Sequence, residues 1–519
     1  MSSSTFFTNS SICFENKQID NLNIDGPENL NAYFGIVTLN AVTAPCTENE
    51  QDIVFMVDCS GSMSDKCADN KTKMQHILHT LQNMITYFHE RPFIKVHITV
   101  MAFDDKIYNI VNRTDINDKN LVSILEKIDD IRPKNGTNIE LALTHVNDYV
   151  LKLKADYPNN NISHIFMTDG EATMGSKEHA ILKGLVDPDI CNAFIGFGIR
   201  HDSQLLNAIS NNKNSGYYFI DAIENSGLVY GEILHGILFK LLNNVVITVK
   251  DGLIYEYKTN SWTDKLSIVP IVSECQKIYH IVSFVPDDCG VTLKSNTEVS
   301  GSEVLVELSR ADDADLTKYI YRQRTLQMLY KANQFQMRSY SREEVQQRRL
   351  IKEDLRSFID EMKQYMAENG LNDDNFFKNL CDDIYICYTT LGTYYGSMYT
   401  SARQTSQGTQ RCYTVSQTPG HTFEDDIELD DDFMLPPMSR INRQVTGFDT
   451  SFGTNADTHT QPLYDYDQEY DEDYDLPPIP PRLVHEVSTF AQTPYLNNSA
   501  TQVMYSINGG SASQDTVEE

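Results

Sequence analysis

The sequence predicts an α/β fold with a doubly wound, mostly parallel sheet, followed by a small β-sandwich, a helical region and a disordered tail. Three observations predict this order. Short apolar, β-branched segments alternate with amphipathic helical segments between about residues 52 and 242. The helical pattern then stops, and strands separated by turn signals follow it. From about residue 403 the chain becomes polar and acidic, which is typical of disorder.

The composition excludes several classes of partner. The 519-residue chain carries a formal net charge of -31, so it should repel nucleic acid and anionic membrane surfaces. No segment approaches the roughly 20 apolar residues that span a bilayer, and the N-terminus has no secretory signal pattern. The ten cysteines form no C-x-x-C pair, so we expect reduced thiols, no RING and a cytoplasmic location.

The first elements in chain order lead up to the α/β domain. Residues 1–28 are polar and are expected to form a flexible N-terminus. Residues 29–48 contain the alternating segment AYFGIVTLNAV, a strand that we expect to join the later β-sandwich. Residues 50–243 should form the α/β domain. Its expected strands read DIVFMVD, IKVHITVMAF, ISHIFMTDG, CNAFIGFGI and GYYFID. Such continuous apolar runs are typical of strands buried on both faces.

Three further regions follow the α/β domain. Residues 244–310 contain alternating strands with the turn signals KDG and DDCG, which indicate an antiparallel sandwich. Residues 311–402 carry apolar residues at helical spacing, and SREE and ENG indicate the start and end of one helix. Residues 403–519 should form a disordered acidic tail that contains proline and tyrosine.

One segment of the α/β domain carries candidate chemistry, DIVFMVDCSGSMSDK. Its buried strand ends in Asp58, and the turn that follows presents the hydroxyls of Ser60 and Ser62 beside it. NGTNIE places Thr137 just before a helix, and HIFMTDGEA places Asp169 at the end of another buried strand. Ligands of open α/β sheets bind at the carboxyl ends of strands, so these segments should converge. Carboxylate and hydroxyl oxygens suit Mg²⁺ or Mn²⁺ better than zinc.

These five residues carry a family resemblance. D-x-S-x-S, then a threonine, then T-D-G resembles the metal-ion-dependent adhesion site of von Willebrand factor type A domains, which are Rossmann-like. The resemblance extends from about Asp52 to Leu242, and FIGFGIRHDSQLLNAISNNKNSGYYFID is similar to a segment of intracellular type A proteins. Some of those proteins are fused to RING domains in ubiquitin ligases and carry a β-sandwich after the type A domain. The absence of a RING here leaves ligase activity without support.

The resemblance implies a metal-dependent binding module and not an enzyme. A divalent cation held by Asp58, Ser60, Ser62, Thr137 and Asp169 would accept an Asp or Glu carboxylate of a partner protein. Three alternatives stay open. The chain could be a Mg²⁺-dependent hydrolase, although such enzymes usually carry D-x-D where this chain has D-x-S. It could also be a ubiquitin-ligase-associated subunit, or a metal-stabilised scaffold that binds through its tail.

The tail contains a second candidate binding segment. Pro477, Pro480 and Arg482 have the P-x-x-P-x-R spacing of a polyproline helix that can bind a Src-homology-3 type domain. Such spacings also occur in plain proline-rich linkers. Four nearby tyrosines lie among acidic residues and are candidate phosphorylation sites. They are Tyr464, Tyr466, Tyr470 and Tyr474.

Overall fold

A computed structural model describes most of the chain up to residue 417. The described residues are 6–27, 31–42, 50–67, 70–198, 201–211, 214–220, 227–273, 275–297, 301–312, 314–335, 341–393, 396–410, 413–417 and 483–487. They all belong to one compact unit, Met1–Pro419 with Arg482–Glu519. A second unit, Gly420–Pro481, lies outside the described residues.

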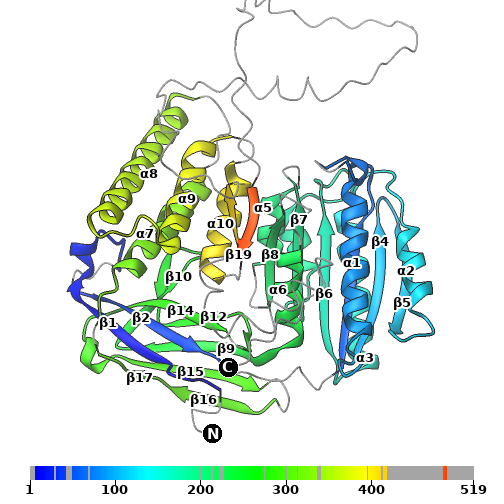
Figure 1. The fold of residues 1–519 in the computed structure, drawn as a ribbon, viewed down its shortest axis with the longest axis horizontal. Helices are drawn as coiled ribbons and strands as arrows, with labels where there is room; N and C mark the ends of the chain where they lie inside the picture. The colour runs from blue at the N-terminus through cyan, green and yellow to red at the C-terminus, as the bar shows by residue number, and fades with distance from the viewer. Residues whose placement is uncertain are drawn as a thin grey trace, which may run out of the picture. The chain divides into compact units, whose positions relative to one another are not determined.

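The α/β region is built on one six-stranded sheet (Figure 1). Its strands, in spatial order, are β5 (Ile107–Asp115), β4 (Val96–Phe103), β3 (Gln51–Asp58), β6 (Asn161–Thr168), β7 (Cys191–Phe197) and β8 (Ser215–Ile220). Neighbouring strands run parallel except β4 and β5, which are antiparallel. From β3 the chain first adds β4 on one side and later adds β6 on the other. The junction of β3 and β6 is therefore the switch point at which such sheets bind ligands.

Helices cover both faces of this sheet. They are α1 (Lys73–His89), α2 (Leu121–Asp129), α3 (Ile139–Asp156), α4 (His179–Gly184), α5 (Ser203–Ile209) and α6 (Gly227–Leu238). One buried apolar cluster contains side chains of α1, α2 and α6, and a second contains those of α3, α4 and α5. Every residue of β3 is buried, as expected of a strand packed on both faces. The predicted α/β class is confirmed, although the sequence patterns did not indicate β5, α4 or α6.

A β-sandwich is formed by two further sheets. The first contains β11 (Ser261–Thr263), β10 (Gly252–Glu256), β14 (Gln276–Ser283), β2 (Tyr33–Asn40), β1 (Ser11–Gln18) and β17 (Ser309–Arg310). The second contains β12 (Lys265–Ile268), β9 (Lys240–Lys250), β15 (Gly290–Thr297) and β16 (Glu303–Glu307), with β13 (Ile271–Val272) paired to β9. Apolar side chains from both sheets share one core, among them Val37 and Ile247. The strand predicted within 29–48 is β2, which pairs with β14.

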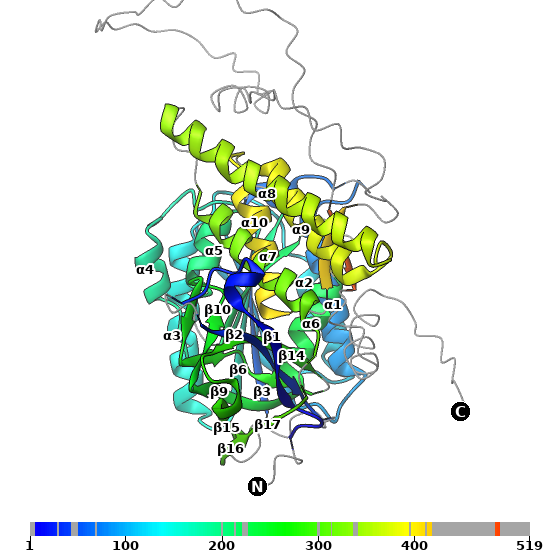
Figure 2. The same cartoon turned by 90° about the vertical axis from the view of Figure 1, so that its left-hand side faces the viewer.

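The N-terminal segment differs from the prediction of a flexible 1–28. Strand β1 pairs antiparallel with β2, and β2 in turn pairs with β14, so β1 extends the first sheet of the sandwich (Figure 2, where β1 is dark blue). Ile12 and Phe14 are each 1% exposed and pack inside the sandwich, while Cys13 faces a different apolar cluster. The strand is buried on both faces, and its few apolar residues stand among polar ones, so its pattern resembles a polar segment.

The helical region contains four helices among the described residues. They are α7 (Thr317–Gln334), α8 (Arg342–Glu368), α9 (Asn375–Thr390) and α10 (Gly396–Thr409). Ser341 caps α8 by accepting a hydrogen bond from the Glu344 backbone N–H at 3.2 Å, as the SREE signal predicted. The buried residues of α8, which include Ile351, Leu355 and Phe358, recur at helical spacing. None of the described helices combines the length and apolar character needed to cross a bilayer.

The beginning of the predicted tail is also corrected. Helix α10 continues to Thr409, past the boundary that the sequence placed after residue 402. Its buried polar residues have partners: Gln407 Nε2 donates to Asp383 Oδ2 at 2.7 Å, and Gln404 Oε1 accepts from Asn333 Nδ2 at 2.9 Å. Farther on, β18 (Tyr413–Gln417) pairs with β19 (Leu483–Val487). The rest of the tail lies outside the described residues.

Candidate metal centre

Three separate segments meet at the carboxyl ends of β3 and β6. Strand β3 ends at Asp58 and is followed by a short 3-10 turn, Gly61–Ser64, which carries Ser62. Strand β6 lies beside β3 in parallel and is followed directly by Asp169. The third segment brings Thr137 to the start of α3, whose N-cap is Asn138. The sheet topology therefore places all three segments at the switch point.

Direct contacts connect four of the five predicted residues. Asp58 Oδ1 accepts a hydrogen bond from the Ser60 backbone N–H at 2.7 Å. The Ser60 and Ser62 hydroxyl oxygens lie 3.1 Å apart, and Ser62 Oγ donates to Asp169 Oδ1 at 2.7 Å. The D-x-S-x-S turn is thus joined to the T-D-G segment across the two strands.

The fifth residue, Thr137, borders the same space. A methyl group placed on Gly170 would lie 3.7 Å from both Ser62 Oγ and Thr137 Oγ1. The hydroxyl groups of Ser62 and Thr137 therefore both lie close to Gly170, the residue after Asp169. Thr137 is 3% exposed, and its N–H donates to Thr173 Oγ1 at 2.8 Å, which fixes its loop. The structure brings all five predicted residues together.

The two carboxylates of the site are buried and oppose each other. Asp58 and Asp169 are both 0% exposed. Burial and the charge of Asp169 raise the pKa of Asp58 to about 6, although hydrogen bonds from Thr168 and Ser60 counteract the increase. The site therefore has more negative charge than its own hydrogen bonds compensate.

Among the residues that the structure describes, Lys73 brings a positive charge to this site. Lys73 is the first residue of α1, and its Nζ lies 2.6 Å from Asp169 Oδ2. The same ammonium lies 3.6 Å from Asp65 Oδ2. The side chain of Lys73 is only 16% exposed. No pattern in the sequence indicated a role for this lysine.

Two supporting residues were also missed. Thr168 Oγ1 donates to Asp58 Oδ2 at 2.6 Å, and thus fixes the carboxylate from the neighbouring strand. Asp104, which follows β4 and is 0% exposed, accepts from Asn135 Nδ2 at 2.9 Å. Asn135 O in turn accepts from the Gly61 N–H at 3.0 Å. The signal for Asp104 was visible in the sequence, because it is another carboxylate at a strand end.

The donor set fits a hard divalent cation. Two carboxylates and three hydroxyls supply only oxygen, which Mg²⁺ and Mn²⁺ prefer. Among the residues that the structure describes, no group of three or more His, Cys, Asp or Glu side chains could hold a metal ion. A cation at this site would therefore depend on the serine and threonine hydroxyls. The repulsion between Asp58 and Asp169, and the approach of the Lys73 ammonium, both show that the site attracts positive charge.

The other candidate residues from the sequence are Cys59 and those of the tail. Cys59 is 1% exposed, and burial raises the pKa of its thiol to about 12, so it is a buried thiol and not a reactive thiolate. Pro477, Pro480 and Arg482 lie outside the described residues, as do the four tail tyrosines. The proposed Src-homology-3 type segment therefore stays a prediction.

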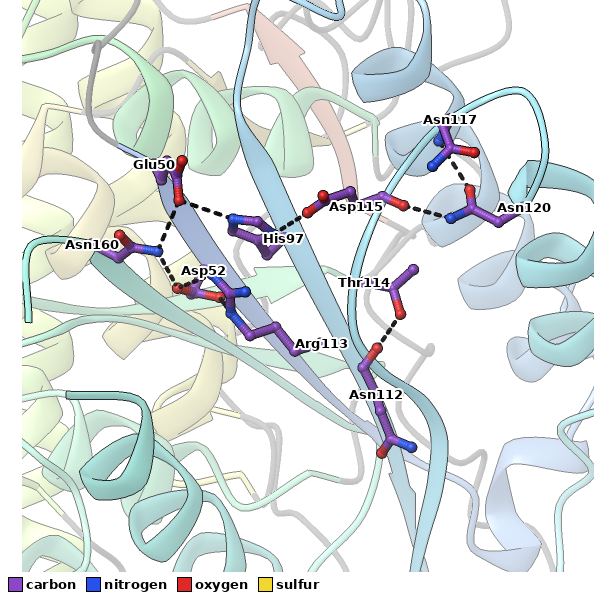
Figure 3. A network of polar contacts seen from close by, with 10 residues as sticks. All are labelled: Glu50, Asp52, His97, Asn112, Arg113, Thr114, Asp115, Asn117, Asn120 and Asn160. Carbon is purple, nitrogen blue, oxygen red and sulfur yellow. Dashed lines mark hydrogen bonds and ion pairs between the residues drawn. The ribbon is translucent and has the colours of Figure 1, made fainter. Parts of the chain in front are cut away.

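A second polar network lies at the opposite end of β3 (Figure 3). The carboxylate of Asp52 is almost fully buried and accepts from Arg113 Nε at 2.7 Å and from Asn160 Nδ2 at 2.9 Å. Beside it, His97 Nε2 lies 3.1 Å from Glu50 Oε2. These groups connect β3, β4 and β5 where the strands begin or end. We assign this network to the stability of the sheet.

Comparison with known proteins identifies the domain. Residues 52–229 match the family model of the von Willebrand factor type A domain. No curated protein matches the chain. This match confirms the family resemblance of the α/β region.

Several solved structures are similar to the chain at low identity. The ArnB paralog VWA2 from Sulfolobus acidocaldarius is 13% identical over 78% of this chain and 100% of its own, with a TM-score of 0.46. A von Willebrand factor type A protein from Catenulispora acidiphila is 13% identical over 78% and 98%, with a TM-score of 0.45. Proximal thread matrix protein 1 from the mussel byssus, with a zinc-occupied MIDAS motif, is 19% identical over 37% and 49%, with a TM-score of 0.31.

Proposed function

Given that residues 52–229 form a von Willebrand factor type A domain, we propose that this domain binds Mg²⁺ or Mn²⁺ and, through it, an acidic residue of a partner protein. Type A domains typically mediate protein–protein interactions, which supports the coarser part of the proposal. The proposed ligands are Asp58, Ser60, Ser62, Thr137 and Asp169.

One observation carries the proposal. Oxygen-bearing side chains from three segments converge at the switch point, and the two carboxylates among them are fully buried. Two buried carboxylates that repel each other are costly unless a cation compensates their charge. Burial and the charge of Asp169 together raise the pKa of Asp58 to about 6. A divalent cation would compensate the negative charge of both carboxylates.

The chain's own residues would divide the work at such a site. Asp58 and Asp169 would supply the negative charge, and the three hydroxyls would supply neutral oxygen atoms. When bound, the cation would offer an electrophilic coordination position that a partner's Asp or Glu carboxylate can fill. The Ser60 N–H and the Thr168 hydroxyl already orient the Asp58 carboxylate for this role.

A non-catalytic role is part of the proposal. The buried Cys59 thiol, whose pKa is about 12, offers no nucleophile. The hydroxyls of Ser60 and Ser62 contact each other, and Ser62 donates to Asp169, so these oxygen atoms lie beside the carboxylate with which they would hold the cation. A Mg²⁺-dependent hydrolase or a ubiquitin-ligase-associated subunit is the alternative. Hydrolysis of a phosphate ester, lost in Asp58→Ala, would support the hydrolase.

The scaffold alternative places binding in the tail. In that case the metal would stabilise the domain only, and a Src-homology-3 type domain would bind around Pro477, Pro480 and Arg482. Capture of a partner would then be independent of metal, while the melting temperature would still depend on it. For every one of these candidate functions we propose the cytoplasmic location that the sequence predicts.

The first experiment measures metal binding and partner capture together. Titration of Mg²⁺ into the full chain by calorimetry should give saturable binding that Asp58→Ala abolishes. Pull-downs from lysate with the same proteins should yield proteins that appear only in Mg²⁺ with the intact site and disappear in EDTA. Asp118→Ala is the matched control. The Asp118 side chain is 95% exposed, so this variant removes the same charge from a position outside the site.

The outcomes separate the candidates. Metal binding with metal-dependent capture supports the bridging role. Metal binding with the same captured proteins in Mg²⁺, in EDTA and with Asp58→Ala would overturn the bridge and favour the tail. An identical response of the intact chain and Asp58→Ala to Mg²⁺ would overturn the metal site itself.

A further inference from the structure

The ion pair between Lys73 and Asp169 lies within the proposed metal site. Lys73 Nζ is 2.6 Å from Asp169 Oδ2, and Ser62 Oγ donates to the other oxygen of the same carboxylate at 2.7 Å. Both oxygens of Asp169 therefore have a partner already. Because Asp169 is fully buried, Lys73 is the charged group that compensates it most directly.

The position of Lys73 is locally unfavourable for a cation. It is the first residue of α1, where the helix dipole and the free backbone N–H groups favour negative charge. The ammonium nevertheless lies there, turned toward Asp169, with its side chain only 16% exposed. The carboxylates of Asp169 and, at 3.6 Å, Asp65 account for this placement.

An ammonium and a divalent cation cannot both be close to Asp169 without strong repulsion. Like charges a few ångströms apart repel strongly in a partly buried environment, because solvent screens them little there. With Lys73 in place, two carboxylates and one ammonium leave a single negative charge. A divalent cation would then reverse the sign of the site.

We propose that Lys73 is an internal competitor for the metal: it occupies Asp169 in the metal-free protein and must leave this carboxylate when the cation binds. This inference rests on the proposed metal site and concerns its regulation. The proposal has two consequences. Lys73 stabilises the buried Asp169 carboxylate when no metal is bound. It also lowers the affinity for the metal below the value that the five ligands alone would give.

The test compares two lysine variants of the full chain. Lys73→Met removes the competing charge and keeps an unbranched side chain at the start of the helix. Lys66→Met removes the same charge from an exposed residue nearby and is the matched control. Calorimetric titration with Mg²⁺ and with Mn²⁺ should show Lys73→Met binding at least roughly tenfold tighter than the unmodified chain. Lys66→Met should bind like the unmodified chain.

A second measurement needs no variant. Lysine acetylation followed by mass spectrometry should label Lys73 slowly in EDTA, because the ion pair occupies its ammonium. Saturating Mg²⁺ should increase the rate several-fold, while the rate at Lys66 stays constant. This readout reports the release of Lys73 directly.

The results distinguish this inference from the proposed function. Unchanged or weaker metal binding by Lys73→Met, with saturable binding by the unmodified chain, would overturn the competition and leave the metal site standing. An acetylation rate at Lys73 that does not change when Mg²⁺ is added would also overturn the proposed competition. If the unmodified chain binds no Mg²⁺ and equals Asp58→Ala, the proposed function fails and the competition fails with it.

Discussion

At the scale of single residues, the Asp58 carboxyl is held by two hydrogen bonds and opposed by a neighbouring charge. The Ser60 N–H and the Thr168 hydroxyl each donate to it, at 2.7 and 2.6 Å. Desolvation and the charge of Asp169 outweigh these donors and raise the pKa of Asp58 to about 6. The same residue that is proposed to hold the metal therefore destabilises the metal-free protein at neutral pH.

This conflict predicts how stability depends on pH. In the unfolded chain an Asp has a pKa of about 3.9, so between about pH 4 and 6 the folded protein retains a proton that the unfolded chain has lost. The free energy of unfolding should therefore fall as the pH rises through this window, by up to about 3 kcal/mol from this group. Asp58→Asn removes the contribution. Urea unfolding in EDTA at several pH values should give a flatter dependence for the variant, and higher stability at pH 7.

The control for this prediction is Asp118→Asn, which changes the charge at an exposed position. Its curve should run parallel to that of the unmodified chain. If Asp58→Asn also runs parallel, the Asp58 carboxyl does not hold its proton in the folded state, and the repulsion from Asp169 is weaker than its burial implies.

The five proposed ligand positions could be identified from the sequence, because each lies at a fixed offset from a strand end or a helix start. The contacts of Lys73 could not. The segment between Asp58 and Lys73 has no regular sequence pattern. The contact between the Lys73 ammonium and Asp169 therefore appears only in the folded structure. Thr168 was within the quoted T-D-G motif, but its role depends on the neighbouring strand, which the motif does not include.

At the scale of elements, the end of β4 supports the loop that carries Thr137. Asp104 accepts hydrogen bonds from Asn135 Nδ2 at 2.9 Å, from Tyr108 Oη at 3.1 Å and from the Lys106 N–H at 2.8 Å. Its own backbone O accepts from the Asn138 N–H at 3.0 Å, next to Thr137. The position of the Thr137 loop is therefore set from β4.

Asp104→Ala should weaken metal binding although Asp104 is not a proposed ligand. Loss of several hydrogen bonds to a buried carboxylate should lower the free energy of unfolding by roughly 2–3 kcal/mol. The released loop should also weaken Mg²⁺ binding by roughly tenfold or more, as is usual for residues that orient metal ligands. Urea unfolding and calorimetric titration on the same preparation measure both effects.

Asp105→Ala is the control, because Asp105 accepts from the same Asn135 Nδ2 at 3.0 Å but only in an exposed contact. It should change both quantities little. An Asp104→Ala protein that is less stable yet binds Mg²⁺ normally would show that the Thr137 loop does not depend on β4.

Strand β1 and helix α10 were not predicted for the same physical reason. In β1 and α10, burial does not follow from hydrophobicity: polar and apolar residues alternate without a clear face, and buried polar groups find partners in distant segments. The Lys277 ammonium, for example, donates to the backbone O atoms of Thr409 and Gln410 at 2.7 and 2.8 Å. These partners are 132 and 133 residues away in the chain, so they leave no local pattern.

At the scale of the whole molecule, the helical region shares a core with the type A domain. Met398, Tyr399 and Ala402 of α10 belong to the same buried apolar cluster as α3 and α5. The rings of Tyr399 and Phe219, at the end of β8, meet edge to face with centroids 5.8 Å apart. The stability of the type A domain therefore also depends on residues of α10, and variants should be studied in the full chain.

The two ends of β3 predict that stability and metal binding can be separated. Arg113 pairs with the buried carboxylate of Asp52 and stacks on the Tyr157 ring at 3.7 Å, at the opposite end of β3 from Asp58. Arg113→Met leaves that carboxylate without its cation, so the free energy of unfolding should fall by about 3 kcal/mol. Distant, independent sites are usually additive, so the Mg²⁺ affinity of the folded protein should not change.

Urea unfolding and calorimetry at a temperature where the variant stays folded measure the two quantities. Arg349→Met is the control, because the pair of Arg349 with Glu353 is exposed and should contribute no more than about 1 kcal/mol. Weaker Mg²⁺ binding in Arg113→Met would show that the two ends of β3 are coupled through the strand. Unchanged binding with reduced stability would place the network of Figure 3 in the scaffold and the metal site at the switch point alone.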